Sequence, residues 1–462
     1  MNANYAEFCA NKHAAHTASG FRLTLTDTPC FPFQASIVEW ALSLGRAAVF
    51  ADTGLGKTIM QLEWARQVYA KTGRPVLILA PLAVVRQTER EAVKFGIHGV
   101  EAFTQDSPIC VWNYDQLHKL DPGRFGGVVL DESSILKNAH GRMRNRLIQA
   151  FMDTPYKLAC TATPSPNDHV ELGNHAEWLG VMGEAVMRAR WFINDLGDTV
   201  QPWRLKMHAV DDFWRWVTTW ARCVGKPSHM GNQFSDDGYV LPPLNIEKHL
   251  VSVDLLEGRA DGMLFRQPEM SATSIHQEKR LTANDRARFA VGQVWREPDE
   301  PWIIWVETNY DQDAVEALLP DAITVRGSDK PEQKAAQLLR FADEGGVIIT
   351  KPKIAGMGLN WQHCARQVFM GGSFSYEGFY QAVRRSWRFG QERRVTVHVV
   401  MAATEQAIWR TIHRKSQQHA AMKSKMYAFS RSAAIRLSRH DDYRPAHVAR
   451  VPTWLKTIGE TS

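Results

Sequence analysis

The sequence lacks the features that would place the protein in a membrane or outside the cell. Its six cysteines are scattered over 462 residues without a CxxC pair, which excludes a disulfide framework and argues against structural zinc. No stretch reaches the roughly 20 apolar residues of a membrane-spanning helix. Residues 1–16 contain no apolar core of the kind found in signal peptides. We therefore expect a cytoplasmic protein that has no membrane partner.

Charge is unevenly distributed along the chain, whose formal net charge is +6. Residues 410–462 hold 11 lysines and arginines against 3 acidic residues, a net of +8, which leaves −2 for the rest. A basic end on a near-neutral body suits contact with a polyanion. A solvated helical tail would explain the same charge equally well.

No internal repeat is present, but short apolar runs alternate with helix-like stretches in two blocks. Such runs predict parallel strands covered on both faces by helices. The fold class is therefore α/β, with two tandem parallel-sheet domains, a helical insertion between them and a basic C-terminal tail. The predicted parts are an N-terminal extension (1–25), a first domain (26–179), a Trp-rich insertion (180–245), a second domain (246–430) and the tail (431–462).

A glycine-rich turn joins the apolar run 47–50 to a helix-like stretch with apolar residues at helical spacing. The order of strand, glycine-rich turn, Lys-Thr and helix is typical of a phosphate-binding loop. Its glycines let the backbone wrap phosphates, and the helix N-terminus adds a positive dipole. Lys57 would hold the β- and γ-phosphates and Thr58 would bind Mg²⁺. The candidate nucleotide-binding residues are Thr53, Gly54, Leu55, Gly56, Lys57 and Thr58.

A second candidate is the pair of carboxylates that ends the apolar run 127–130. Adjacent acidic residues after a buried strand lie at the C-terminal edge of a sheet, where ligands bind in such folds. Asp131 can bind Mg²⁺, and Glu132 can orient and deprotonate an attacking water. The spacing of about 75 residues from the phosphate loop supports this interpretation.

A third candidate is the basic and aromatic segment 381–391, QAVRRSWRFGQ. On a helix, Gln381, Arg385 and Arg388 would share one stripe. Two guanidiniums on one face could grip a γ-phosphate as its charge develops. A solvated basic helix is the alternative, although Trp387 and Phe389 interrupt the charge.

Together these segments resemble superfamily 2 helicases of the DEAD/DEAH type, most like the Swi/Snf-like branch and compact phage or prophage helicases. The resemblance covers residues 25–415, and its motifs occur in the family order. It implies two RecA-like domains that bind ATP and Mg²⁺ between them, in a bacterial or phage-infected cell. The matching segments are FPFQ (31–34), ADTGLGKT (51–58), LILAPLAVVRQ (77–87), ICVWNYDQL (109–117), LDES (130–133), TATP (161–164), IAGMGLN (354–360) and QAVRRSWRFGQ.

The resemblance assigns further roles, residue by residue. Gln34 would read adenine, and Gly358 and Gln381 would contact the nucleotide. Arg385 and Arg388 match the two catalytic arginines of the family. The sequence departs from the family pattern at Ser134, where the family usually has histidine, and at Ala51, where the phosphate-loop consensus has glycine. The residues expected to contact nucleic acid or couple it to hydrolysis are Asn113, Thr161, Thr163 and Asn360.

The insertion interleaves tryptophans with basic residues, as at Trp203-Arg204 and Trp214-Arg215-Trp216. Such residues could stack on bases and contact the phosphate backbone. Alternatively, they could form a small helical core packed by tryptophan.

The sequence leaves three functions open. The first is an ATP-driven motor that tracks along double-stranded DNA without reading its sequence, and the second is a strand-separating helicase on DNA or RNA. The third is an ATP-gated scaffold that hydrolyses nucleotide incidentally. No nuclease or methyltransferase motif is present.

Overall fold

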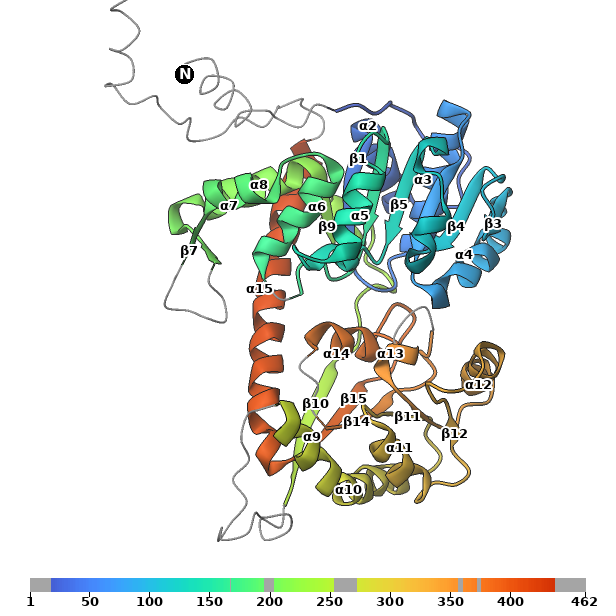
Figure 1. Ribbon diagram of the computed structural model, residues 1–462, viewed down its shortest axis with the longest axis vertical. Coiled ribbons are helices and arrows are strands. Elements are labelled where there is room, and N and C mark those ends of the chain that lie inside the picture. The colour runs from blue at the N-terminus through green and yellow to red at the C-terminus, as the bar shows by residue number, and fades with distance from the viewer. Residues whose placement is uncertain are drawn as a thin grey trace, which may run out of the picture.

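The computed structural model describes residues 18–166, 168–194, 203–252, 272–355, 360–371 and 375–436. These residues form two α/β domains that lie one above the other and are connected along one side by a long helix (Figure 1). The prediction of an α/β fold with two tandem domains, each a parallel sheet with helices on both faces, is confirmed. Within the described residues no helix is both long and apolar enough to span a bilayer.

The first domain is built on a seven-stranded sheet in the order β3-β4-β2-β5-β6-β1-β9, with all neighbours parallel. Its strands are apolar on both faces because helices cover both. In β1, for example, Phe50 faces one hydrophobic cluster and Val49 the other. The strands are β1 (Arg46–Ala51), β2 (Val76–Ala80), β3 (Val100–Ala102), β4 (Ile109–Asn113), β5 (Gly127–Asp131), β6 (Tyr156–Cys160) and β9 (Ala221–Val224).

Two layers of helices enclose this sheet. One layer contains α2 (Pro32–Leu44), α3 (Lys57–Thr72) and α4 (Leu82–Lys94). The other contains α5 (Arg142–Ala150), α6 (Leu172–Leu179), α7 (Glu184–Trp191) and α8 (Val210–Trp220). A short antiparallel ribbon of β7 (Phe192–Asn194) and β8 (Trp203–Leu205) projects from α7.

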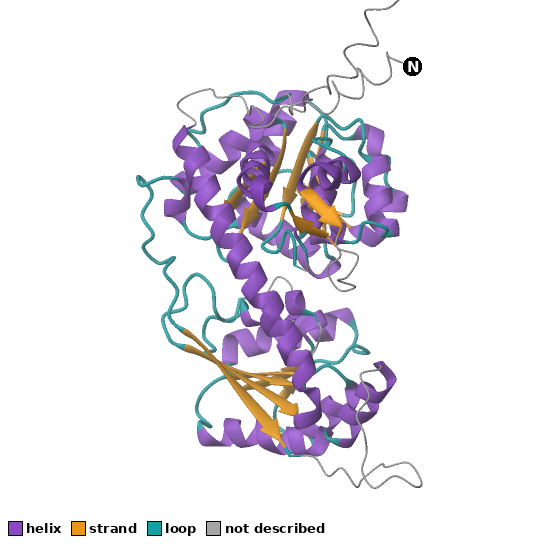
Figure 2. Cartoon of the chain, turned by 90° about the vertical axis from the view of Figure 1, so that its left-hand side faces the viewer, coloured by secondary structure: helices purple, strands orange, loops and turns teal. Residues whose placement is uncertain are grey.

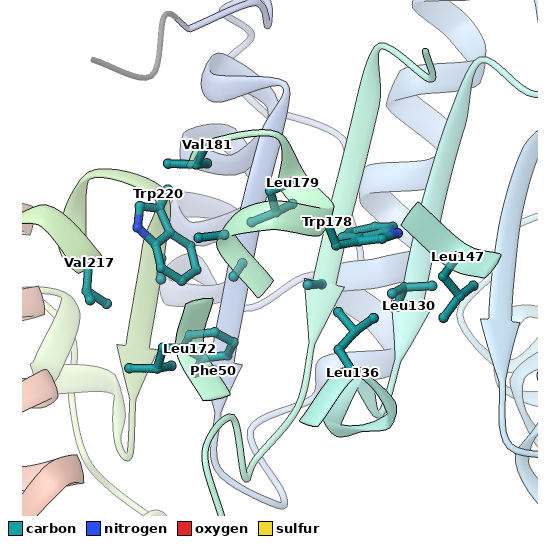
Figure 3. Packing of buried hydrophobic residues seen from close by; sticks show 14 of the residues in the cluster. Phe50, Leu130, Leu136, Leu147, Leu172, Trp178, Leu179, Val181, Val217 and Trp220 are labelled. Atoms are coloured by element: carbon teal, nitrogen blue, oxygen red, sulfur yellow. The ribbon is translucent and has the colours of Figure 1, made fainter. Parts of the chain in front are cut away.

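The Trp-rich segment belongs to the core of the first domain. Its strand β9 pairs with β1, so residues 221–224 extend the first sheet although the sequence places them in an insertion. Trp178 and Trp220 pack against the same face of the sheet as Phe50 (Figure 3). Five tryptophans of this region are buried: Trp178, Trp191, Trp214, Trp216 and Trp220. For these five the interpretation as a tryptophan-packed core is correct, and the interpretation as a surface that stacks on bases is wrong.

The second domain has a six-stranded parallel sheet in the order β10-β15-β14-β11-β13-β12. Its strands are β10 (Leu244–Val251), β11 (Trp302–Trp305), β12 (Ile323–Thr324), β13 (Val347–Thr350), β14 (Arg366–Met370) and β15 (Val395–Ala402). Its helices are α9 (Ala272–Leu281), α10 (Ala283–Arg296), α11 (Asn309–Glu316), α12 (Pro331–Glu344), α13 (Pro352–Ala355) and α14 (Tyr376–Val383).

The helix α15 (Gln406–Arg436) follows β15 and runs from the second domain to the first (Figures 1 and 2). Met422 and Met426 pack into the core of the first domain, and Ser430 Oγ accepts a hydrogen bond from the Cys223 N–H at 3.0 Å. The predicted boundary between residues 430 and 431 falls inside this helix. Residues 437–462, which form most of the predicted tail, lie outside the described residues.

Candidate active site between the two domains

The phosphate-binding loop lies between β1 and α3, at the C-terminal edge of the first sheet. Gly54 and Gly56 have φ values of 93° and 77°, in the left-handed region that favours glycine. Because α3 begins at Lys57, its unpaired backbone N–H groups face the loop. The Lys57 ammonium donates hydrogen bonds to the carbonyls of Ala51 at 3.0 Å and Asp52 at 3.4 Å. Thr53, Leu55 and Thr58 complete the loop and the first turn of α3.

Gln34, in the first turn of α2, supports this loop. Its Nε2 donates to the Leu55 carbonyl at 2.9 Å, and its Oε1 accepts from the Phe31 N–H at 2.8 Å. A Cβ atom on Gly56 would lie 2.3 Å from the same Nε2, so only glycine fits there. The structure thus gives Gln34 a role in fixing the loop, while its contact with adenine stays a prediction.

Asp131 is the last residue of β5, beside the phosphate loop. Gln61 of α3 donates its Nε2 to Asp131 Oδ1 at 2.7 Å, and Tyr114 donates its hydroxyl to the Asp131 carbonyl at 2.6 Å. Burial raises the pKa of Asp131, although the Gln61 hydrogen bond and the charge of Lys57 oppose that shift. A buried carboxylate of this kind is stabilised by a nearby cation, so Asp131 and Thr58 fit the oxygen ligands that Mg²⁺ prefers.

Glu132 follows in a left-handed backbone conformation, with φ 53° and ψ 54°. For a residue other than glycine this conformation costs on the order of 1–2 kcal/mol, so the surrounding contacts must hold it. One such contact is the Thr161 hydroxyl, which donates to Glu132 Oε2 at 3.2 Å. Burial raises the pKa of Glu132, and the charge of Lys57 opposes the shift. The carboxylate is therefore oriented and is a stronger base than an exposed glutamate.

The prediction that Gln381, Arg385 and Arg388 share one helical stripe is wrong. Helix α14 ends at Val383, and the chain continues as turns. The Arg385 N–H bonds to the carbonyl of Ala382, three residues back, and Gly390 has a φ of 86°. The Gln391 side chain then ties this turn to the Gln362 carbonyl at 2.8 Å.

The turn nevertheless directs both arginines toward the first domain. The charges of Arg385 and Glu132 act on each other, which places this guanidinium near the carboxylate pair. Burial and the neighbouring charge of Arg388 lower the pKa of Arg385 to about 9. Burial and the charge of Arg384 lower the pKa of Arg388 to about 10. Adjacent buried cations of this kind form a site that an anion stabilises.

Asp52, inside the phosphate loop, joins the two domains. Its carboxylate forms an ion pair with Lys423 of α15 and another with Arg384 at 3.2 Å. The hydroxyls of Tyr380 and Tyr427 each donate to it at 3.2 Å. Burial alone would raise the pKa of Asp52, but the charges of Lys423 and Arg384 outweigh burial and hold it well below the ordinary value. We call this cluster of Asp52, Tyr380, Arg384, Lys423 and Tyr427 the Asp52 latch.

A second contact between the domains runs through Glu377 of α14. Thr163 donates its hydroxyl to Glu377 Oε1 at 3.3 Å, and Lys137 forms an ion pair with the same carboxylate. Thr161 and Thr163 are fully buried. They thus connect the Glu132 region to the second domain, a position suited to coupling rather than to direct contact with nucleic acid.

A cavity of about 720 Å³ opens between the domains beside this contact. Asn113 and Glu132 line it from the first domain, and Lys351 and Gln381 line it from the second. Asn113 and Gln381 therefore line the same cavity as Glu132, the candidate catalytic base. Asn360 is exposed elsewhere, and Gly358 lies outside the described residues.

Sequence reasoning missed the residues that link the two halves of the site. Asp52 occupies a position that the phosphate-loop pattern leaves variable, and Lys423 is 371 residues away from it. Glu377 lies between two motifs without belonging to either. No spacing rule connects such distant residues, and the only available signal was the acidic residue inside an otherwise uncharged loop.

No known protein-family profile matches the chain. A segment is 29% identical over 197 residues to protein p41 of Acyrthosiphon pisum secondary endosymbiont phage 1, covering 35% of this chain and 42% of that protein. The chain is also 25% identical over 164 residues to the CHD3-type chromatin-remodeling factor CHR7 of Arabidopsis thaliana, covering 30% of this chain and 14% of that protein. The chain thus spans less than half the length of either curated relative.

One solved structure with a similar chain course is the Sulfolobus solfataricus SWI2/SNF2 ATPase core in complex with dsDNA. The match covers 90% of this chain and 98% of that one, at 15% sequence identity and a TM-score of 0.41. The chain is therefore similar, over about a third of its length in each case, to a phage protein and to a chromatin-remodelling factor.

Proposed function

We propose that this protein is an ATP-dependent motor of the superfamily 2, Swi/Snf-like type that tracks along double-stranded DNA. The observation that carries the proposal is the arrangement of Lys57, Asp131 and Glu132 opposite Arg385 and Arg388. Arg385 and Glu132 come from different domains, yet their charges act on each other across a buried interface. Hydrolysis at such an interface is coupled to the relative position of the domains.

We assign the residues of the two domains separate roles in phosphoryl transfer. Lys57 and the backbone N–H groups at the start of α3 would bind the β- and γ-phosphates. Asp131 and Thr58 would hold Mg²⁺, which neutralises charge on the phosphates. Glu132 would orient a water molecule and accept its proton, while Arg385 and Arg388 would stabilise the charge that develops on the γ-phosphate.

Coupling to movement would use the contacts that cross between the domains. Thr161 donates to Glu132, and Thr163 donates to Glu377. The Thr163 N–H also donates to the Thr161 hydroxyl at 3.1 Å, so a change at the γ-phosphate would be transmitted through the two threonines. Closing on ATP and opening after hydrolysis would then shift one domain relative to the other. Tracking along DNA needs only backbone contacts, which carry no sequence information. We therefore expect binding that is independent of sequence.

Lys57→Ala and Glu132→Gln test the catalytic assignment. Each should abolish phosphate release, because one removes phosphate binding and the other removes the base, but Glu132→Gln should still bind a fluorescent ATP analogue. Exposed Lys119 offers a control, and Lys119→Ala should leave turnover unchanged. Hydrolysis at the wild-type rate in either active-site variant would contradict the proposal.

The substrate is tested by measuring ATP hydrolysis with duplex DNA, single-stranded DNA and RNA in parallel. We expect duplex DNA to stimulate at least as well as single strands, and we expect displacement of a bound triplex strand with poor unwinding of a forked duplex. Stimulation by single strands alone, with efficient unwinding, would instead indicate a strand-separating helicase. Equal turnover with and without every nucleic acid would indicate an ATP-gated scaffold.

A further inference from the structure

A cluster of two histidines and a glutamate lies in the second domain, outside the candidate active site. Glu247 and His249 are two residues apart on the edge strand β10, so their side chains share one face. His398 lies on the neighbouring strand β15 and is the register partner of Glu247. The three polar groups converge because the pairing of β10 with β15 brings them to the same face of the sheet.

The three potential ligand atoms form a nearly regular triangle. His249 Nε2 lies 3.0 Å from His398 Nδ1, and Glu247 Oε2 lies 3.6 Å from the first and 3.3 Å from the second. Tetrahedral ligands bound to zinc at about 2.0–2.1 Å are separated from one another by about 3.3 Å. An ion that contacts all three atoms therefore needs only small side-chain movements.

The surroundings hold the two imidazole rings in place. His398 stacks on Trp302 with ring centroids 5.8 Å apart, and Phe289 lies 4.9 Å from the His249 ring. The Glu247 side chain is 43% exposed, so solvent and ions can reach the cluster.

Other charges near the cluster partly cancel. Arg366, whose charge acts on His398, is paired with Glu297 at 2.7 Å. Arg296 acts on His249 from α10 and donates a hydrogen bond to Gln293 at 3.1 Å. The carboxylate of Glu247 therefore supplies the one anionic ligand. The imidazole nitrogens of His249 and His398 would select the kind of metal ion that binds.

We propose that Glu247, His249 and His398 bind a divalent transition-metal ion of the zinc class, with water as the fourth ligand. Imidazole nitrogen is a ligand that zinc accepts readily, whereas Mg²⁺ and Ca²⁺ favour sites made of oxygen alone. The lack of paired cysteines in the sequence does not bear on this site, since it uses none.

Such an ion would fasten the edge of the second sheet. Among the described residues, strand β10 pairs with a neighbour on one side only, and its burial alternates between partly exposed and exposed residues. Its anchoring therefore depends on β15, and an ion that joins His249 to His398 adds a cross-link between these two strands. The role is structural and independent of ATP hydrolysis.

The test uses the full chain, stripped of metal with a chelator and then titrated with Zn²⁺ or Co²⁺. We expect one ion per chain, a strong visible absorption band of tetrahedral Co²⁺, and slower amide exchange in β10 when Zn²⁺ is bound. Loss of a supporting residue costs zinc sites about 10–100-fold in affinity, so His249→Gln, which removes a direct ligand, should cost at least that much. Glu247→Gln should weaken binding as well, and both positions are exposed enough for the domain to fold.

His413→Gln is the matched control, because His413 is an exposed histidine of α15 that lies beside Gln417 on the same helix, outside the Glu247 cluster. It should retain wild-type stoichiometry and affinity. The proposal is overturned if the wild type binds no Zn²⁺ at micromolar concentration, or if His249→Gln and Glu247→Gln bind it as tightly as the control. ATP hydrolysis can persist or fail in any of these proteins without affecting the result, so this test is separate from that of the proposed function.

Discussion

Single residues in the candidate site are held in unfavourable states that their neighbours stabilise. Glu132 has a left-handed backbone and a buried carboxyl group, and Thr161 and Lys57 provide the compensating hydrogen bond and charge. Arg385 is a cation whose pKa is lowered first by burial and then by the charge of Arg388 beside it. Strain of this kind persists only where surrounding structure fixes it, and it is concentrated at functional sites.

The pH dependence of hydrolysis should reflect Glu132. Only the ionised carboxylate can accept a proton, so activity is lost as pH falls through the pKa of Glu132. Burial raises that pKa above the ordinary 4.5, so the acid limb of the kcat profile should lie above pH 4.5. Thr161→Val removes a hydrogen bond to the carboxylate and should move the limb to still higher pH. An acid limb at or below that of an exposed glutamate would contradict this account.

Arg388 should act on the rate rather than on binding. An arginine that stabilises the transition state contributes about 10³–10⁵ in rate in related phosphoryl-transfer systems. Arg388→Ala should therefore lose most turnover while ATP affinity changes little, measured by phosphate release and by nucleotide titration. Arg340→Ala, at an exposed position of α12, serves as the control. If Arg388→Ala weakened only the affinity, Arg388 would be a binding residue alone.

Among the elements, α15 has a position that its composition did not predict. Its basic residues suggested a tail, but the helix begins after β15 and packs on β9 and α8 of the other domain. Lys423 reaches the phosphate loop from this helix and joins the Asp52 latch. Helix α15 therefore contacts the glycine-rich loop that follows β1, where Asp52 lies 371 residues before Lys423 in the chain.

Breaking the latch should loosen α15 from the first domain. Asp52→Asn leaves Lys423 and Arg384 buried without their anion, and removing one partner of a buried ion pair costs about 3–5 kcal/mol. Since 1.36 kcal/mol corresponds to a tenfold change, amides of α15 near Lys423 should exchange at least about 100-fold faster. Lys425→Met, at an exposed position of the same helix, should leave exchange unchanged. Equal exchange in Asp52→Asn and the wild type would show that the latch does not hold the domains.

At the scale of the whole molecule, the surplus positive charge lies in a helix that bridges two domains. Residues 410–436 contain seven lysines and arginines and no acidic residue. Lys423 is paired with Asp52, whereas Arg410, Arg414, Lys425 and Arg431 are exposed. The binding of a polyanion to this helix would therefore depend on the relative position of the two domains.

The salt dependence of DNA binding should report on this helix. For duplex DNA, a protein that neutralises one phosphate fewer has a slope of log affinity against log salt that is shallower by about 0.9. Replacing Arg410, Arg414 and Lys425 with glutamine should lower the slope by up to about 3, measured by fluorescence anisotropy with duplex DNA. Truncation after residue 436, which leaves α15 intact, shows whether residues 437–462 contribute separately. An unchanged slope in both proteins would favour the solvated-helix interpretation.

The sequence alone determined the α/β class, the glycine-rich turn between β1 and α3 and the position of the carboxylates at the end of β5. These features follow from local rules, because apolar runs, glycine positions and strand ends depend on neighbours within a few residues. It did not reveal β10, whose alternating polar residues reflect a sheet edge, or the end of α14 before Arg385. The formation of β10 depends on which strand lies beside it. The end of α14 depends on the turn that the Gln391 side chain ties to the Gln362 carbonyl.

Only the tertiary structure decided how the two halves of the site meet. The contacts of Asp52 with Lys423, of Thr163 with Glu377 and of His249 with His398 join residues that are far apart in the chain. Their pairing depends on sheet order and on the path of α15, which involve the whole chain at once. Long-range packing rather than local pattern therefore sets the pKa values, the contacts between domains and the geometry of the Glu247, His249 and His398 cluster.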